Sequence, residues 1–499
     1  MTRQISGDAP PAPDRPFGPR FVSPMLLGSA LNPINSSVIA TGLVAIAAAL
    51  HIPVGQTSIL ISSLYLTSAI AQPTAGRLAE EFGPRRIFLV GILIVLLGGI
   101  VGGIGQNLPT LVVSRVLIGM GTSAGYPSAM LLIRRRASAV GLQSPPSTVL
   151  ASLAMAGSVT IAIGPTIGGL LVGWFNWRAA FLINVPVALT ALAMALAWIA
   201  PDTERMRGRS AREIASRIDL LGVIGFGGAM TALLVFLLAL PRANWIALAV
   251  AVVTAAALAC WELRAANPFL DVRLLASNGV LTRTYVRYGL TLLGVYTILY
   301  GLTQWIEIAR GLSAFDAGLV LIPMGVCSAI TARVVARHTR LRLSLTVSAA
   351  LLIIGAIGTL LLTSHSPLIA IVGVTAVFGL MSGSSTVTNQ TALYRAAPPH
   401  AVGTASGLLR TSGYVGSIAS ATLTGLVFRT HVDDSGLHKT SLILIGIGIV
   451  VLLMTALDRG LAGPSNPSNP ETSATGPSVP KQPTQPSAPA DNTREGATA

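Results

Sequence analysis

The first long apolar run of this sequence holds a cluster of side chains that can form hydrogen bonds. Within LNPINSSVIATGL, Asn32, Asn35 and Ser36 are spaced i, i+3 and i+4, so they share one face of a helix. Pro33 weakens the backbone hydrogen bonds among them. Because amides and hydroxyls that face lipid are costly, we expect this face to line a polar cavity that binds a solute. Hydrogen bonding to a neighbouring helix is the alternative explanation.

Arg115 is a charged residue inside another apolar run, LVVSRVLIGMG. A charge at the centre of a spanning helix costs ~2.5–3.5 kcal/mol on insertion scales. Arg115 should therefore face water, a carboxylate or backbone carbonyls, where it could serve substrate binding or proton coupling. Alternatively, its guanidinium reaches the membrane surface. Other polar side chains of the apolar runs are candidates for the same cavity wall, with ordinary packing as the alternative for each: Tyr296, Tyr300, Gln304 and Asn389.

These residues must be positioned by helices that cross a membrane. Only 10% of the residues are charged, against roughly 25% in soluble domains, and the mean hydropathy is +0.71. Since a helix needs ~20 apolar residues to cross the hydrocarbon core, we expect about fourteen spans. They are 22–49, 55–75, 86–106, 108–133, 147–173, 179–200, 219–240, 243–263, 286–309, 314–335, 343–363, 367–390, 403–428 and 440–457.

The net charge of +15 reflects topology rather than an anionic partner such as nucleic acid. With a cytoplasmic N-terminus, most Lys and Arg residues fall on the cytoplasmic side, as the positive-inside rule requires. The outer loops hold few of them: Arg178, Arg242, Arg310, Arg429 and Lys439. No signal-peptide pattern precedes the first span. Cys260 and Cys327 fall in apolar segments and imply no disulfide framework.

The runs divide the chain into five parts. We expect a cytoplasmic tail (1–20), a six-helix bundle (21–200), cytoplasmic linkers with two extra transmembrane helices (201–283), a second six-helix bundle (284–458) and a disordered cytoplasmic tail (459–499) rich in proline. No phosphate-binding loop, HExxH or Cys/His cluster is present. We therefore expect no enzyme, cofactor or metal site, and any solute movement would be driven by a gradient.

The stretch GRLAEEFGPRRIFL resembles the loop signature of the major facilitator superfamily, roughly G-x-L-A-D-R-x-G-R-R. Gly76 and Gly83 match that signature, Glu80 stands in the place of its acid, and Arg85 and Arg86 follow. The glycines permit a tight turn, and a carboxylate beside arginines at helix ends can form a charge latch. The resemblance implies a cytoplasmic gate; an ordinary hairpin that satisfies topology is the alternative.

The run GSVTIAIGPTIGGLL resembles the GPxxGG element of the antiporter branch of this superfamily, through Gly164, Pro165, Gly168 and Gly169. Proline bends a helix and glycines allow a neighbour to approach closely. The stretches WFNWRAAFLINVP, DLLG, GLSAFDAGLVLIP and GTASGLLRTSGYVGSIAS are similar to the fourteen-helix drug:proton antiporter branch. The implied fold is all-α: the major facilitator fold, with two six-helix bundles and two extra central helices.

That branch usually has an acid early in the first span, in a pattern like LDxTIVNVALP. Asn32 takes its place here, and an amide cannot exchange a proton for a drug as a carboxylate can. Glu307, in LTQWIEIARG, is the best remaining carboxylate for proton coupling; an interfacial pairing with Arg310 is equally compatible with the sequence.

The expected function is secondary active efflux of drugs or other small amphipathic molecules, by alternating access and proton antiport. The protein would be a monomer in the plasma membrane with both termini cytoplasmic. Because the acid of the first span is absent, neutral or anionic substrates are favoured over lipophilic cations. Export of a cell-envelope lipid or metabolite, import or uniport, and a receptor or scaffold that does not transport are the alternatives.

Overall fold

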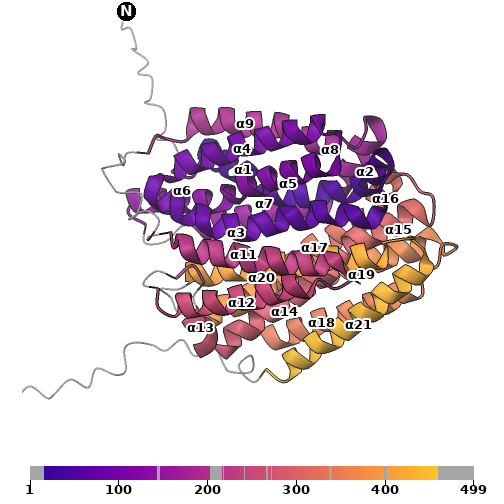
Figure 1. Cartoon of the computed structure of the whole chain (residues 1–499). Helices are drawn as coiled ribbons and strands as arrows, with labels where there is room; N and C mark the ends of the chain where they lie inside the picture. Colours follow the sequence, from indigo (N-terminus) through magenta and orange to yellow (C-terminus); the bar gives the residue numbers. More distant parts are fainter. Residues whose placement is uncertain are drawn as a thin grey trace, which may run out of the picture. The chain divides into compact units, whose positions relative to one another are not determined.

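The computed structural model describes residues 16–142, 146–202, 216, 218–240, 242–265, 268–270, 272–336, 340–397 and 402–458, and these residues form helices without a single strand (Figure 1). The expected tail 459–499 and most of the tail 1–20 lie outside them. The helices are α1 (Pro19–Val38), η1 (Ile39–Gly42), α2 (Leu43–Leu50), η2 (Val54–Thr57), α3 (Ser58–Phe82), α4 (Pro84–Ile104), α5 (Leu108–Ser123), α6 (Gly125–Ala139), α7 (Ser147–Trp174), α8 (Ala179–Leu182), α9 (Asn184–Trp198), α11 (Leu220–Ala239), α12 (Trp245–Glu262), α13 (Val272–Ser277), α14 (Gly279–Thr297), η3 (Ile298–Leu302), α15 (Thr303–Ile308), α16 (Ala314–Val320), α17 (Ile322–Val335), α18 (Leu341–Leu360), α19 (Leu368–Ala396), α20 (Val402–Val427) and α21 (Asp434–Ala456).

Twelve of the helical segments in the described part of the chain are long and apolar enough to cross a membrane. This is fewer than the expected fourteen. The runs of α7 and α20 are not among these twelve; within α7 the segment Ile163–Trp174 counts as a shorter apolar one. In α20 the many Gly, Ser and Thr residues and Arg410 lower the hydropathy. Large apolar side chains such as Val253, Ile354 and Leu442 are exposed on the outer helices, as expected of a multi-pass membrane protein.

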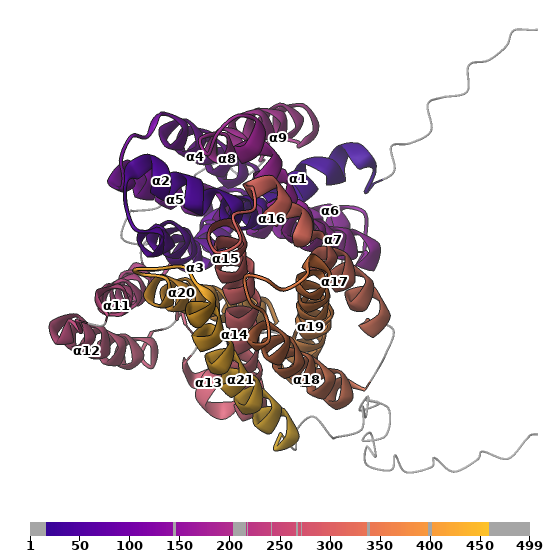
Figure 2. The same cartoon turned by 90° about the vertical axis from the view of Figure 1, so that its right-hand side faces the viewer.

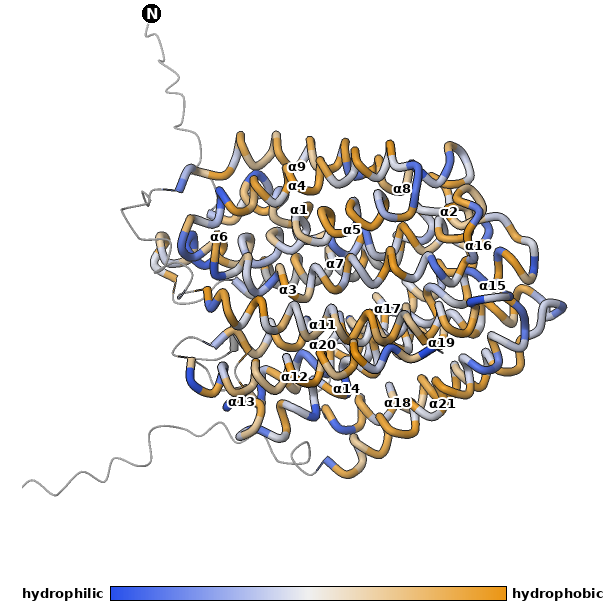
Figure 3. Tube along the Cα trace, in the orientation of Figure 1, coloured by the Kyte–Doolittle hydropathy of each residue, from blue (hydrophilic) through white to orange (hydrophobic). Residues whose placement is uncertain are grey.

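The helices run alternately between two ends of the bundle. Hydrophilic residues gather at these ends and hydrophobic residues follow the lengths of the helices (Figure 3). We call the end with α2, α8, α15 and α16, on the right in Figure 1, the Gly311 end, after the loop between α15 and α16. The opposite end, where α3 turns into α4, is called the Gly83 end.

Local sequence sets where helices start and stop. The side chains of Asn107, Asn244 and Asp433 accept hydrogen bonds from backbone amides three residues on, and so cap α5, α12 and α21. Gly83 ends α3 with a φ of 97°, which glycine adopts readily. Pro84 then begins α4, where its fixed φ suits the first helical position.

The helices pack as two groups joined along a few lines of contact. In the first group α1 packs against α7 and α4 against α5; in the second α14 packs against α20 and α17 against α19. The groups meet where α3 packs against α20 and α7 against α16 and α17. The pair α11 and α12 lies at the edge beside α3 and α20 (Figure 2). The largest hydrophobic core contains residues of both groups.

Close approach of α17 and α19 gives a test of this packing. A Cβ at Gly379 of α19 would lie 2.3 Å from the carbonyl oxygen of Met324, whereas a Cβ at Gly373 of the same helix would meet nothing within 4 Å. We expect Gly379→Ala to lower the free energy of unfolding by about 1–3 kcal/mol, because the helices must separate. Thermal unfolding in detergent measures this. Gly373→Ala is the matched control; equal stability of the two variants would contradict the packing.

Candidate functional site

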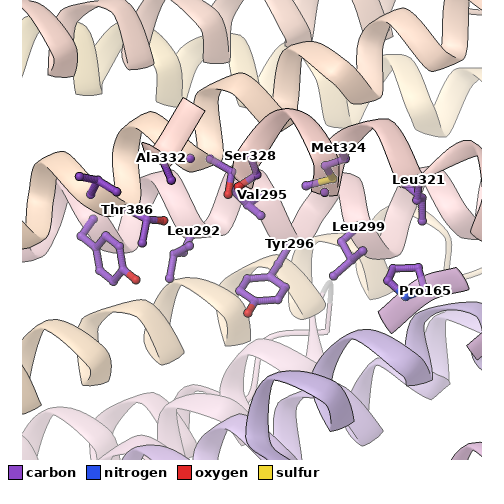
Figure 4. Close-up of a pocket in the computed structure, with 15 residues that line it drawn as sticks. Pro165, Leu292, Val295, Tyr296, Leu299, Leu321, Met324, Ser328, Ala332 and Thr386 are labelled. Carbon is purple, nitrogen blue, oxygen red and sulfur yellow. The ribbon is translucent and has the colours of Figure 1, made fainter. Parts of the chain in front are cut away.

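A cavity of about 130 Å³ lies among α14, α17 and α19, next to Pro165 of α7. It extends from Leu321, just before α17, to Ala332 of α17, with Met324 and Tyr296 on facing sides (Figure 4). Its described wall is Pro165, Tyr288, Leu292, Val295, Tyr296, Leu299, Leu321, Met324, Gly325, Ser328, Ala332, Ser382, Gly383, Thr386 and Val387.

The chemistry of this wall is apolar with a few hydroxyl groups. Leucine, valine and methionine side chains supply contact surface, and Tyr288, Tyr296, Ser328, Ser382 and Thr386 supply hydroxyls that donate and accept hydrogen bonds. No charged side chain belongs to the wall as far as it is described. Such a cavity suits an uncharged or weakly polar molecule that is oriented by a small number of hydrogen bonds.

Of the residues that the sequence suggested for a cavity, Tyr296 alone belongs to this described wall. Tyr300 packs behind it, with the two rings stacked 5.6 Å apart. The Tyr300 hydroxyl donates to the carbonyl of Ser36 at 2.9 Å and lies 3.1 Å from the Tyr65 hydroxyl. Tyr300 therefore links η3 to α1 and α3, across the two groups of helices.

The polar face of α1 is engaged by neighbouring helices. The Asn32 amide donates to the hydroxyls of Ser68 (2.9 Å) and Thr122 (3.0 Å). Asn35 and Asn184 of α9 exchange two amide hydrogen bonds, of 2.6 and 2.8 Å. The Ser36 hydroxyl donates to the carbonyl of Pro33. For Asn32 and Asn35 this geometry corresponds to the alternative explanation, hydrogen bonding to neighbouring helices, whereas the Ser36 hydroxyl bonds within α1.

Arg115 is buried, with only 2% of its surface exposed. Its Nε donates to the carbonyl of Leu60 at 3.0 Å and its Nη1 to the carbonyl of Asn35 at 3.1 Å. Its Nη2 is also buried and has no hydrogen-bond partner among the described residues. The guanidinium thus points inward and joins α5 to α1 and α3, rather than reaching the membrane surface.

Gln304 and Glu307 of α15 carry buried oxygens without partners. Oε1 of each accepts no hydrogen bond within the described part of the chain. Arg310, the expected alternative partner of Glu307, donates instead to the carbonyl of Ser366. Asn389 of α19 lies elsewhere, where its Oδ1 accepts from Nε of Arg287 at 3.0 Å. The expected residues are therefore spread over several places rather than gathered around one cavity.

The gate stretch is organised around an acid that sequence reasoning overlooked. Asp202, which follows α9, accepts hydrogen bonds from the backbone amides of Arg85 (3.3 Å) and Arg86 (3.0 Å) at the start of α4. Its side chain is 3% exposed and lies 4.0 Å from Arg135. A Cβ at Gly83 would collide with it at 2.4 Å. Glu80, the expected acid, is exposed, and Gly76 approaches Pro127 of α6.

The glycines of the GPTIGG stretch lie where α7 meets its neighbours. A Cβ at Gly164 would lie 1.8 Å from the Ser37 hydroxyl, and one at Gly168 2.3 Å from the carbonyl oxygen of Val38. On the other side, Gly169 faces the carbonyl of Ala314 in the second group of helices. Pro165 faces both Gly318 and the cavity.

Further contacts between the groups, and one buried charge cluster, were missed. Arg410 of α20 stacks over the Tyr126 ring of α6 at 3.7 Å, and the Tyr414 hydroxyl donates to the amide oxygen of Gln72. Separately, Asp458 pairs with Arg283 (2.9 Å) and with buried Arg287 (3.7 Å). Arg410 is a charged residue within the stretch GTASGLLRTSGYVGSIAS, but its partner Tyr126 is distant in sequence. Asp458 lies at the end of an expected span, where a charged residue is ordinary.

Comparisons with known proteins agree with this fold. A family model described as Major Facilitator Superfamily matches residues 25–421. A Bacillus subtilis (strain 168) protein named "Uncharacterized MFS-type transporter YwoD" is 32% identical over 445 residues, covering 87% of this chain and 95% of that protein. The "Methylenomycin A resistance protein" of Streptomyces coelicolor is 27% identical over 417 residues, covering 80% and 82%. The solved structure of a POT family transporter in complex with 5-aminolevulinic acid matches with a TM-score of 0.67 at 14% identity, covering 89% and 98%.

The amide pair of Asn35 and Asn184 can be tested by a double-mutant cycle. We expect Asn35→Ala and Asn184→Ala each to lower the free energy of unfolding, because each leaves the other amide buried without its partner. The coupling energy should be roughly 0.6 kcal/mol and at most about 1.7 kcal/mol. Equilibrium unfolding in a denaturing detergent measures it. Asn32→Ala combined with Asn184→Ala is the control and should be additive, since Asn32 bonds other residues. Additivity of the first pair would refute the contact.

Proposed function

We propose that this chain, which belongs to the major facilitator superfamily and is a multi-pass membrane transporter, exports small amphipathic molecules in exchange for protons. The superfamily points to transport rather than catalysis. The observation that carries the proposal is the cavity beside α7, whose apolar wall carries hydroxyl groups, a combination that suits small amphipathic molecules. Its relative in Streptomyces coelicolor is named for resistance to methylenomycin A, which supports export of antibiotics here.

The proposed architecture is that of the fourteen-helix branch, with bundles at 21–200 and 284–458 and two extra helices between them. The lengths of α7 (28 residues) and α20 (26 residues) support counting both as spans, since ~20 residues suffice to cross the hydrocarbon core. Both helices are needed to build the cavity region: α7 contributes Pro165 and α20 packs along α14.

Alternating access requires contacts between the bundles that can open at each end in turn. At the Gly311 end, Gly169 touches Ala314, and the Thr166 hydroxyl donates to the carbonyl of Gly318 at 3.1 Å. Further toward the Gly83 end, Arg410 lies over Tyr126. The contacts at the Gly311 end join small residues to backbone atoms, and the contact toward the Gly83 end joins a cation to an aromatic ring. Either set can separate without breaking a helix, which supports rocking of two bundles.

The proposed substrates are neutral or anionic rather than cationic. The described wall of the cavity holds no carboxylate to attract a cation, and Asn32 stands in the place of the acid expected in the first span. Arg115 is a buried cation that contacts this region of α1, and it donates to two backbone carbonyls. Affinity would come from apolar contact, with hydroxyl groups setting orientation.

Glu307 is the proposed carrier of the exchanged proton. Its Oε1 is buried without a hydrogen bond from the described residues, and Arg310 bonds Ser366 instead. A carboxylate in such surroundings can hold a proton and release it when water reaches the site. The proposal also makes the protein a monomer in the plasma membrane. The distribution of Lys and Arg supports an orientation with the Gly83 end and both termini cytoplasmic and the Gly311 end outside.

Filling the cavity tests the proposed binding site. We expect Thr386→Trp to abolish export of dyes or antibiotics from proteoliposomes with an imposed pH gradient, because the indole would occupy the space for substrate. Ile369→Trp on the same helix, where Ile369 is 74% exposed, is the control and should export like the unmodified protein. Normal export by Thr386→Trp would exclude this cavity as the binding site. A protein that moves none of the compounds while retaining its cellular phenotype would favour a scaffold.

A substitution at Glu307 tests proton coupling. We expect Glu307→Gln to abolish proton movement and uphill export, while exchange of labelled for unlabelled substrate without a gradient continues. A pH-sensitive dye and labelled substrate in the same proteoliposomes measure both. Asp316→Asn, which removes another acid of the Gly311 end that bonds Ser313, serves as the control. Unchanged proton movement in Glu307→Gln would assign the proton to a different residue.

A further inference from the structure

Two acids meet at the Gly83 end of the extra helix pair. Asp219 precedes α11 and Glu262 is the last residue of α12. A Cβ at Gly222 would lie 2.2 Å from Oδ2 of Asp219 and 2.6 Å from Oε1 of Glu262. The two carboxylates are therefore within a few ångströms of each other, over a glycine that leaves them room. Asp219 is 4% exposed and Glu262 1%, so water screens neither of them.

Asp219 accepts hydrogen bonds at both of its carboxylate oxygens. Its Oδ1 accepts from the backbone amide of Gly222 at 3.1 Å and from the indole of Trp261 at 2.8 Å. Its Oδ2 accepts from the backbone amide of Phe269 at 2.8 Å. Three donors therefore surround this carboxylate. Asp219 also has a φ of 52°, a conformation that non-glycine residues rarely adopt and that marks sites held in place by their surroundings.

Glu262 has the opposite surroundings. Both of its carboxylate oxygens are buried, and neither accepts a hydrogen bond from the described residues. The backbone amides of Phe269 and Leu270 lie nearby without reaching hydrogen-bond geometry. Two neighbouring buried carboxylates cannot both keep their charge easily, and the one with fewer donors takes the proton.

The charged groups around the pair come from several elements. Arg77 of α3 lies within the electrostatic field of both acids and of Glu80, and its Nη2 donates to the carbonyl of Pro268. Arg264 and Arg273, beyond the end of α12, are exposed, and Arg273 donates to the carbonyl of Leu263. From α20, the titratable residue Tyr414 packs against the cluster around Phe226 and Phe269.

We propose that Asp219 and Glu262 form a proton-binding site in which Glu262 carries the proton and Asp219 the charge. Both acids belong to the extra helix pair, whereas Arg77 belongs to α3. A movement of α3 therefore changes the distance between the Arg77 guanidinium and the carboxyl group of Glu262. When Arg77 approaches, the O–H bond of Glu262 breaks and its proton passes to water at the Gly83 end. The carboxylate that remains is balanced by the guanidinium.

This inference is separate from the proposed antiport through Glu307. It gives the extra helix pair a role of its own: protonation of Glu262 is linked to the position of α3, the helix that runs into the gate stretch at Glu80 and Gly83. A site of this kind responds to cytoplasmic pH without lying on the path of the substrate.

Infrared spectroscopy of the full-length protein in detergent at neutral pH tests the site without any transport. The difference between the spectra of the unmodified protein and Glu262→Gln should contain the carbonyl band of a protonated carboxylic acid. Asp219→Asn, which can still cap α11, should also lose that band, because Glu262 then ionises beside Arg77. Asp433→Asn, at an exposed helix cap, is the control and should retain the band.

One result would overturn the proposal: the Glu262→Gln variant lacks a carboxylate band of the unmodified protein but retains its full carboxylic-acid band. Glu262 would then be ionised in the unmodified protein. Retention of the acid band in Asp219→Asn would remove Asp219 from the site. Near-identical thermal unfolding of the variants confirms that the comparison is between folded proteins. An absence of transport by the unmodified protein would refute the proposed function and leave this test intact.

Discussion

A polar group inside the membrane is stabilised by a partner within the protein, because hydrocarbon offers none. The packing of the first group of helices follows from that constraint. Arg115 satisfies it with backbone carbonyls of α1 and α3, and Asn35 with the amide of Asn184. These bonds connect four helices through three buried side chains, those of Arg115, Asn35 and Asn184. The hydrophobic effect adds little between helices surrounded by lipid, so such bonds and close packing decide which helices are neighbours.

The same constraint explains what could be predicted from the sequence and what could not. The apolar runs reveal the helices because each run must be long enough to cross the bilayer. The composition also indicates which side chains avoid lipid, and Arg115 does bond backbone carbonyls as expected. The partner is harder to predict: Asn184 lies 149 residues from Asn35 along the chain. A face of Asn and Ser looks the same whether it lines water or another helix.

The gate stretch shows a second reason why the structure differs from the expectation based on the sequence. Resemblance to the family signature directed attention to Glu80, but the acid at the start of α4 is Asp202, from a distant loop. Physically, what α4 requires is a negative group at its N-terminus, and the signature does not fix which segment supplies it. Likewise, the buried cluster of Asp458 with Arg283 and Arg287 depends on how α14 packs near the end of α21. No local sequence pattern predicts that packing.

The π-helical turn η3, between α14 and α15, has a consequence for how this region is compared among relatives. A π turn holds one residue more than an α turn, so it rotates everything after it by about 100° around the axis. A helical wheel drawn continuously from Gly279 to Ile308 would therefore place Gln304 and Glu307 on the wrong side. Aligning this chain with a relative that has a regular helix here requires a one-residue gap within the span. Without that gap, every position beyond Leu302 would be matched to a residue facing a different direction.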